Sequence, residues 1–132
     1  MFTVSVKEQF AAAHRLPELG EGLHGHTYAV RVSVERPGID RQGIACDFRI
    51  LKRTLRTIVE PLDHQYLNDL GIFSGKNPTA ENIAVYVYEA FAQALVRDAS
   101  SETERTHPLV RSVEVAESDT ARVTYEKTGP KP

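Results

Sequence analysis

Apolar and polar side chains alternate in four stretches of this chain, and this alternation sets most of what the chain can fold into. A period of two is typical of a strand with one buried face, whereas a helix needs apolar residues three and four apart. The predicted strands lie at residues 2–7, 28–36, 113–115 and 123–125. Pro37 and Gly38 end the second strand, and a turn near Ser118 and Asp119 joins the last two.

Two helices are predicted between the second and third strands. The first begins at the capping residue Asp47 and ends near Pro61, and the second begins at the capping residue Thr79 and ends near residue 96. Their inner faces consist of Phe48, Leu51, Leu55, Ile58 and Leu62 in the first helix, and of Ile83, Val87, Ala90, Phe91 and Ala94 in the second. The order β-β-α-α-β-β predicts an α+β fold in which both helices cover one face of an antiparallel sheet. We expect one domain at residues 1–128, with an exposed polar excursion at 98–108 and a tail at 129–132.

The composition limits the classes of function. With 132 residues, 41% of them hydrophobic, the chain can bury one core. No stretch approaches the roughly 20 apolar residues of a membrane span, and the first residues alternate where a signal peptide would be continuously apolar. A net charge of −2 argues against a nucleic-acid surface, which needs clustered Lys and Arg. We therefore expect a soluble cytoplasmic protein with no nucleic-acid or membrane partner.

Three of the five histidines, His14, His24 and His26, lie close together in the sequence. A His-x-His pair on a strand presents two imidazoles on one face, and a third histidine on an adjacent strand can complete a site for a divalent metal such as Zn²⁺. Three protein ligands leave one position open, as in catalytic zinc sites. The alternative is that these are polar strand residues with no ligand. The single cysteine, Cys46, cannot form an internal disulfide or a thiolate cage, and we expect it to pack as a small buried hydrophobe.

A sheet of this size has two open edges. Unpaired edge strands favour pairing with another chain, and symmetric self-association would close them into a barrel. A functional site can then lie between subunits.

Five motifs along the chain resemble one enzyme family. They are Phe10-Ala-Ala-Ala-His-Arg-Leu-Pro17, Leu23-His-Gly-His26, Leu62-Asp-His-Gln-Tyr-Leu-Asn68, Asn77-Pro-Thr-Ala-Glu-Asn82 and Val115-Ala-Glu-Ser118. Together they are similar to the 6-pyruvoyl-tetrahydropterin synthase and 6-carboxytetrahydropterin synthase family. The resemblance implies the tunnelling fold (T-fold), in which trimers close a barrel and commonly pair as hexamers. It also implies zinc on His14, His24 and His26, and a pterin bound at a subunit interface.

The same resemblance implies roles for other residues. Asp63 and His64 match the family's acid–base pair, although from sequence alone they are equally well explained as surface turn residues. Glu117 matches the glutamate that anchors the pterin, since a carboxylate can accept two hydrogen bonds from the planar N–C–NH₂ edge; otherwise it would be a solvated acid at a strand end. Thr79 and Glu81 begin a helix, so capping already explains them, and a pterin contact is an added prediction.

The chain departs from the family pattern at one position. Many members have a cysteine four or five residues before the His-x-His pair, where this chain has Gly20 and Leu19. Glu21, three residues before His24, resembles the subgroup in which a glutamate replaces or accompanies the cysteine. A carboxylate whose pKa is raised by burial can serve as the base. Glu18 is a second candidate for this role, and a flexible loop acid between two glycines is the alternative for Glu21.

The expected function is therefore a zinc-dependent lyase that acts on 7,8-dihydroneopterin or its triphosphate. A base would remove a side-chain hydroxyl proton and start a retro-aldol cleavage to 6-hydroxymethyl-7,8-dihydropterin. Two alternatives stay open: 6-pyruvoyl- or 6-carboxytetrahydropterin synthesis, and a zinc- and pterin-binding relative with weak catalysis. The sequence does not distinguish a folate pathway from a deazapurine (queuosine) pathway, or a homotrimer from a homohexamer.

Overall fold

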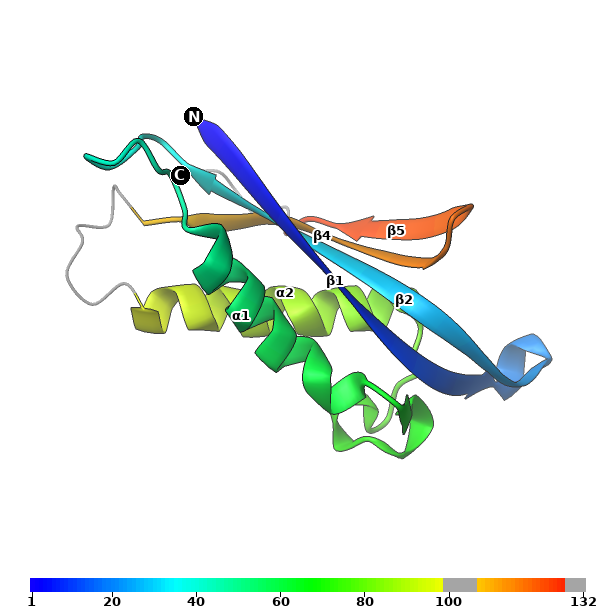
Figure 1. Ribbon diagram of the computed structural model, residues 1–132. Coiled ribbons are helices and arrows are strands. Elements are labelled where there is room, and N and C mark those ends of the chain that lie inside the picture. The colour runs from blue at the N-terminus through cyan, green and yellow to red at the C-terminus, as the bar shows by residue number, and fades with distance from the viewer. Residues whose placement is uncertain (99–106, 128–132) are drawn as a thin grey trace.

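The computed structural model describes residues 1–98 and 107–127, and in these residues two helices cover one face of a five-stranded sheet (Figure 1). The strands are β1 (Phe2–Leu16), β2 (Glu21–Arg36), β3 (Gln65–Tyr66), β4 (Leu109–Ser118) and β5 (Ala121–Tyr125). The helices are α1 (Phe48–Val59) and α2 (Ala80–Asp98). The predicted order is confirmed, with the two-residue β3 as an addition. The expected tail and most of the expected polar excursion lie outside the described residues.

The sheet has the strand order β3-β1-β2-β4-β5. Neighbouring strands are antiparallel except for the short β1–β3 pair. The sheet is open: β5 ends it on one side, and on the other side β3 pairs with β1 only at Ala12 and Ala13. No helix within the described ranges is long and apolar enough to cross a membrane.

The β1–β2 hairpin is longer than the sequence pattern predicts. Its register runs from Phe2 opposite Arg36 to His14 opposite His24, and a 3₁₀ turn at Pro17–Leu19 closes it before Gly20, which has a φ of 71°. The run Ala11-Ala12-Ala13 is part of β1, although alanine has low strand propensity. The three alanines pair with Thr27, His26 and Gly25 of β2, and this tertiary pairing outweighs the local preference.

Both helices begin and end near the predicted residues. The side chain of Asp47 caps α1 by accepting a hydrogen bond from the Arg49 amide, and Pro61 lies in the 3₁₀ turn that follows the helix. The prediction that Phe48 is buried is wrong, because its exposed fraction is 60%. Phe48 lies in the same angular sector of the helix as the buried Leu55 and Val59, about 20° from each, but it is the first residue of α1, and the buried residues of the helix begin only at Leu51.

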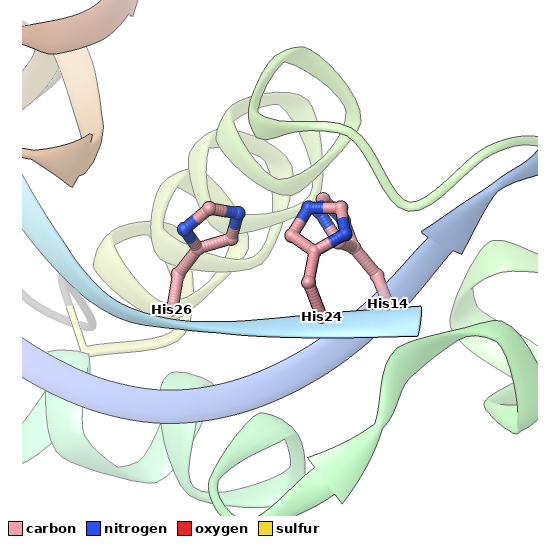
Figure 2. A group of neighbouring side chains, drawn as sticks. All are labelled: His14, His24 and His26. Carbon is pink, nitrogen blue, oxygen red and sulfur yellow. The ribbon is translucent and has the colours of Figure 1, made fainter. Parts of the chain in front are cut away.

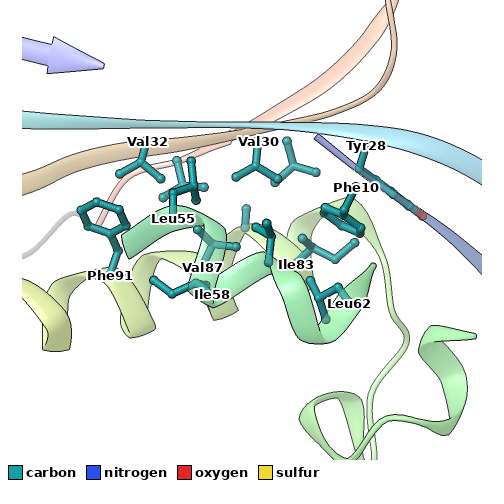
Figure 3. Close-up of a cluster of buried hydrophobic side chains, with 14 of the residues drawn as sticks. Phe10, Tyr28, Val30, Val32, Leu55, Ile58, Leu62, Ile83, Val87 and Phe91 are labelled. Atoms are coloured by element: carbon teal, nitrogen blue, oxygen red, sulfur yellow. The ribbon is translucent and has the colours of Figure 1, made fainter. Parts of the chain in front are cut away.

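The core lies between the sheet and the two helices (Figure 3). On β2 the alternate residues Tyr28, Val30, Val32 and Val34 are fully buried against helix residues such as Leu55 and Phe91. His24 and His26 continue the same face of β2 beyond this apolar stretch and are half-buried. Because side chains alternate between the two faces of a strand, the predicted metal ligands on β2 lie on the same face as the core residues.

Candidate metal centre and its surroundings

The three predicted metal ligands meet at one end of the β1–β2 hairpin. Their imidazoles rise to the same side of the sheet (Figure 2), with ring centroids 4.6 to 5.2 Å apart. His24 faces His14 because the two residues are directly opposite in the register, and His26 follows two residues along β2. One nitrogen from each ring lies within 4.8 Å of the other two.

Hydrogen bonds select which nitrogen of each ring faces the cluster. His14 Nδ1 donates to the Pro78 carbonyl at 2.9 Å, and His24 Nδ1 donates to the Gly22 carbonyl at 2.7 Å. A carbonyl oxygen can only accept, so both neutral rings carry their proton on Nδ1 and a lone pair on Nε2. These two Nε2 atoms face each other at 2.9 Å. Two lone pairs at this distance repel each other, and a proton or a metal ion shared by the two nitrogens would remove the repulsion.

The third ring completes the set. His26 Nε2 is buried and has no hydrogen-bond partner. Burial lowers the pKa of His26, and the neighbouring His14 and His24 lower it further while Glu117 opposes the shift, so the neutral ring that binds metals is favoured. Three converging imidazole lone pairs, two of them fixed by carbonyl groups, fit a Zn²⁺ ion with one open coordination position.

Tyr28 lies beneath the cluster. Its hydroxyl is 3.3 Å from His14 Nδ1, and its ring stacks on Phe10 with centroids 4.9 Å apart. Burial raises the pKa of Tyr28, with a further contribution from Glu117, so the hydroxyl stays protonated.

Glu21 reaches the cluster from its solvent side. Its Oε2 is 3.8 Å from His24 Nε2, and its side chain is 51% exposed. Glu21 does not lie in a loop, as the alternative interpretation assumed, but is the first residue of β2 and pairs with Leu16. Glu18 is exposed in the 3₁₀ turn at the tip of the hairpin. Of the two candidate bases, Glu21 is the one with an ion-pair contact to a cluster histidine.

Glu117 reaches the cluster from β4. Its Oε2 is 3.8 Å from His26 Nε2. Val113 and Val115 are buried on the helix-covered face of β4, and Glu117 continues that face two residues later. An acid that the sequence alone explains as a solvated strand end therefore faces the same site as the three histidines.

Asp63 and His64 form a pair at the β1 edge. His64 Nδ1 is 3.1 Å from Asp63 Oδ2, while Asp63 Oδ1 accepts the Ala11 amide at 2.9 Å. This amide hydrogen bond, and then the nearby His64 and Arg56, lower the pKa of Asp63. His64 has a φ of 59° and an 81% exposed side chain.

The Asp63–His64 pair is near the cluster without contacting it. His64 and His26 border the same open hollow between β1, β2 and β3. Over residues 1–98 and 107–127, no hydrogen bond or ion pair joins this pair to Glu21 or to the three histidines.

Thr79 and Glu81 occupy the start of α2, as predicted. Thr79 Oγ1 accepts the Asn82 amide at 3.2 Å, which confirms the capping role, and Glu81 is exposed in the first turn. Cys46 is half-buried against the core and lies near the other end of β2, where Arg36 donates to the Ala45 carbonyl. Arg36 is ten residues from His26, about 30 Å along the strand, so Cys46 is remote from the cluster.

The sequence prediction missed the groups that hold the imidazoles. The carbonyls of Pro78 and Gly22 are backbone atoms, which no residue type reveals. The Gly22 contact is local, because it lies two residues before His24. The Pro78 contact joins residues 64 positions apart and depends on how α2 packs beside the hairpin.

Comparison with known proteins gives consistent relatives. The sequence profile of the family described as 6-pyruvoyl tetrahydropterin synthase matches residues 3–128. A protein named dihydroneopterin monophosphate aldolase, from Pyrococcus furiosus, is 39% identical over 93 residues, which cover 70% of this chain and 76% of the relative. The 6-carboxy-5,6,7,8-tetrahydropterin synthase of Bacillus subtilis is 29% identical over 132 residues, which cover 94% and 84%.

The fold also has close counterparts among solved structures. The 6-pyruvoyl tetrahydropterin synthase of Caenorhabditis elegans superposes with a TM-score of 0.75 over 96% of each chain, at 24% identity. The predicted α+β tunnelling fold is thereby confirmed, and the open sheet fits a barrel that is closed by oligomerisation.

Proposed function

This chain belongs to the 6-pyruvoyl tetrahydropterin synthase family, and from this we propose that it is a zinc-dependent lyase that cleaves the side chain of a dihydroneopterin. The proposed reaction is a retro-aldol cleavage to 6-hydroxymethyl-7,8-dihydropterin. The name of the relative from Pyrococcus furiosus supports a dihydroneopterin monophosphate as the substrate. The free or triphosphorylated compound is the alternative substrate.

One observation carries the proposal: a carboxylate lies beside the three imidazoles in a chain that lacks the cysteine found before the His-x-His pair in many family members. Glu21 Oε2 lies 3.8 Å from His24 Nε2, and Cys46 lies near the opposite end of β2. A base in this position can reach a substrate atom held at the open coordination position. Zinc, when bound, would supply a Lewis acid that favours the deprotonated form of a side-chain hydroxyl.

The residues of the chain divide the remaining work. Glu117 would accept two hydrogen bonds from the N–C–NH₂ edge of the pterin and orient the ring. Glu21 would take the proton of the C2′ hydroxyl; the C1′–C2′ bond then breaks, C2′ becomes an aldehyde carbon, and the electron pair passes from C1′ into the conjugated ring. His64, paired with Asp63, would return a proton to C1′.

A second copy of the chain would complete this site. Glu21 and His64 are both largely exposed, and the Asp63–His64 pair lies on the open β1 edge. A neighbouring copy at that edge would exclude water from the site and bring an acid–base pair to it. We therefore propose a homotrimer or a homohexamer as the active form.

The test is to incubate the zinc-loaded protein with dihydroneopterin, its monophosphate and its triphosphate, and to identify the pterin products. We expect 6-hydroxymethyl-7,8-dihydropterin. Glu21→Gln should keep zinc and pterin binding but slow the cleavage by about 10²–10⁴-fold, as expected for loss of a general base. Glu18→Gln is the matched control and should retain wild-type turnover.

Each other outcome selects a different function. A 6-pyruvoyl or 6-carboxy product would replace the lyase by a synthase. Loss of turnover in Glu18→Gln but not in Glu21→Gln would transfer the base to Glu18. No turnover on any dihydropterin, with tight pterin binding, would indicate a binding protein.

A further inference from the structure

We infer that Asn82 is a positioning residue of the metal centre: its side chain holds the Asn77–Thr79 turn so that the Pro78 carbonyl fixes the imidazole of His14. This inference rests on the metal site of the proposed function. It assigns to a helix-start residue a role in ligand geometry, and it adds one residue to the set that determines metal affinity.

The contact between Pro78 and His14 is the first step of the argument. His14 is fully buried, and its Nδ1 donates to the Pro78 carbonyl at 2.9 Å. If the carbonyl moves away, the neighbour left beside Nδ1 is the Tyr28 hydroxyl at 3.3 Å, which can donate as well as accept, so the ring is free to turn or to move its proton to Nε2. Either change removes the Nε2 lone pair from the metal position. The Pro78 carbonyl thus selects both the tautomer and the orientation of His14.

The second step is what holds Pro78. Two donors converge on the Asn77 carbonyl: Asn82 Nδ2 at 2.7 Å and the Thr79 amide at 2.9 Å. Pro78 lies between these anchored neighbours and has no amide hydrogen of its own, so its carbonyl direction depends on them. Among the described residues, the side chains that bond to this turn from outside it are His14, the ligand itself, and Asn82, which can be changed without altering the backbone of the turn.

A capping role alone does not account for Asn82. Thr79 already caps α2, because its Oγ1 accepts the Asn82 amide and its carbonyl accepts the Ile83 amide. A side chain at the position of Asn82, three residues after the cap, would normally accept the cap residue's own amide hydrogen. Here that amide bonds to Asn77 instead, and the Asn82 side chain donates to the same carbonyl. Asn82 therefore fixes the turn in front of the helix.

The test compares zinc affinities by competition with a chelator in the wild type, Asn82→Ala and Asn82→Asp. Asn82→Asp has nearly the same shape but places an acceptor against the Asn77 carbonyl. Both variants should bind zinc about 10–100-fold more weakly, the usual effect of removing an outer-shell partner. Asp47→Ala is the matched control, because it removes the cap of the other helix, near the far end of β2, and should leave zinc affinity unchanged.

A second measurement follows His14 directly. In the metal-free wild type, ¹⁵N spectra of the histidines should show His14 protonated at Nδ1, and in the Asn82 variants this signal should shift toward a mixture of tautomers. Wild-type zinc affinity and an unchanged His14 signal in both variants would overturn this inference and leave the proposed function intact. An equal loss of affinity in Asp47→Ala would also overturn it, as general destabilisation. Failure of the wild type to bind zinc tightly would overturn the proposed metal site and this inference together.

Discussion

His24→Ala should separate metal binding from folding more cleanly than any other change at the cluster. His14 is fully buried, so its removal would also disturb the core, whereas the His24 side chain is 35% exposed. His24 has one hydrogen bond to the backbone, from Nδ1 to the Gly22 carbonyl. In the metal-free protein its Nε2 lone pair faces that of His14 at 2.9 Å, which is unfavourable.

These contacts set the size of the effect. Loss of one neutral hydrogen bond costs about 0.5–1.5 kcal/mol, and relief of the facing lone pairs offsets part of it, so the metal-free variant should be nearly as stable as the wild type. Bound zinc should stabilise the wild type by about 4 kcal/mol when free zinc is about 1,000 times the dissociation constant. If the loss of one ligand weakens binding about 1,000-fold, the same zinc concentration stabilises the variant by only about 0.4 kcal/mol.

The assay is urea unfolding with zinc and with a chelator, together with metal analysis of the purified proteins. His64→Ala is the matched control, since this exposed histidine lies outside the cluster and should leave the zinc-dependent stabilisation intact. Near-stoichiometric zinc in His24→Ala at limiting metal, or an undiminished zinc-dependent stabilisation, would refute the ligand assignment.

Three further outcomes are expected. Glu117→Gln should weaken pterin binding and retain zinc, because a donor replaces one of two acceptors; unchanged pterin affinity in a titration would place the ring elsewhere. The lowered pKa of Asp63 means that its carboxylate stabilises the fold fully above its unfolded pKa of about 3.9 and loses this effect as the pH falls through the folded value. Asp63→Asn should therefore unfold at lower urea than the wild type at about pH 7, and the difference should close as the pH falls through the lowered pKa of Asp63, whereas a difference that is independent of pH would exclude the charge as its cause. Light scattering should give a mass of three or six subunits, and a stable active monomer would contradict the site between copies.

The fold was predictable where local pattern and tertiary environment agree. The alternating valines of β2 and the caps Asp47 and Thr79 carry their own signals, and the structure has those elements in place. The prediction failed where tertiary pairing decides the outcome. The alanines of β1 form a strand because the long strand β2 pairs with them, and Phe48 is exposed because it is the first residue of α1, whose buried residues begin at Leu51.

The candidate site was predictable in its ligands but not in its support. Period-two spacing and an adjacent strand are enough to bring three imidazoles together, since both follow from strand geometry. The groups that orient the rings are backbone carbonyls, one of them 64 residues from its histidine, and sequence carries no signal for such a pair. The position of Glu117 beside His26 depends in the same way on the order of the strands in the sheet, which the alternation pattern leaves open.

The metal centre and the acid–base residues of the proposed active site differ in whether they require a second copy of the chain. The candidate metal centre lies within one chain, because β1, β2 and the turn before α2 supply the three histidines and both orienting carbonyls. The acid–base residues are not joined within one chain: Glu21 and His64 are exposed, and among the described residues no hydrogen bond or ion pair links Glu21 to Asp63 or His64. Dilution that separates the subunits should therefore abolish cleavage before it reduces zinc content. Parallel loss of zinc and activity on dilution would mean that the metal centre also depends on the neighbouring copy.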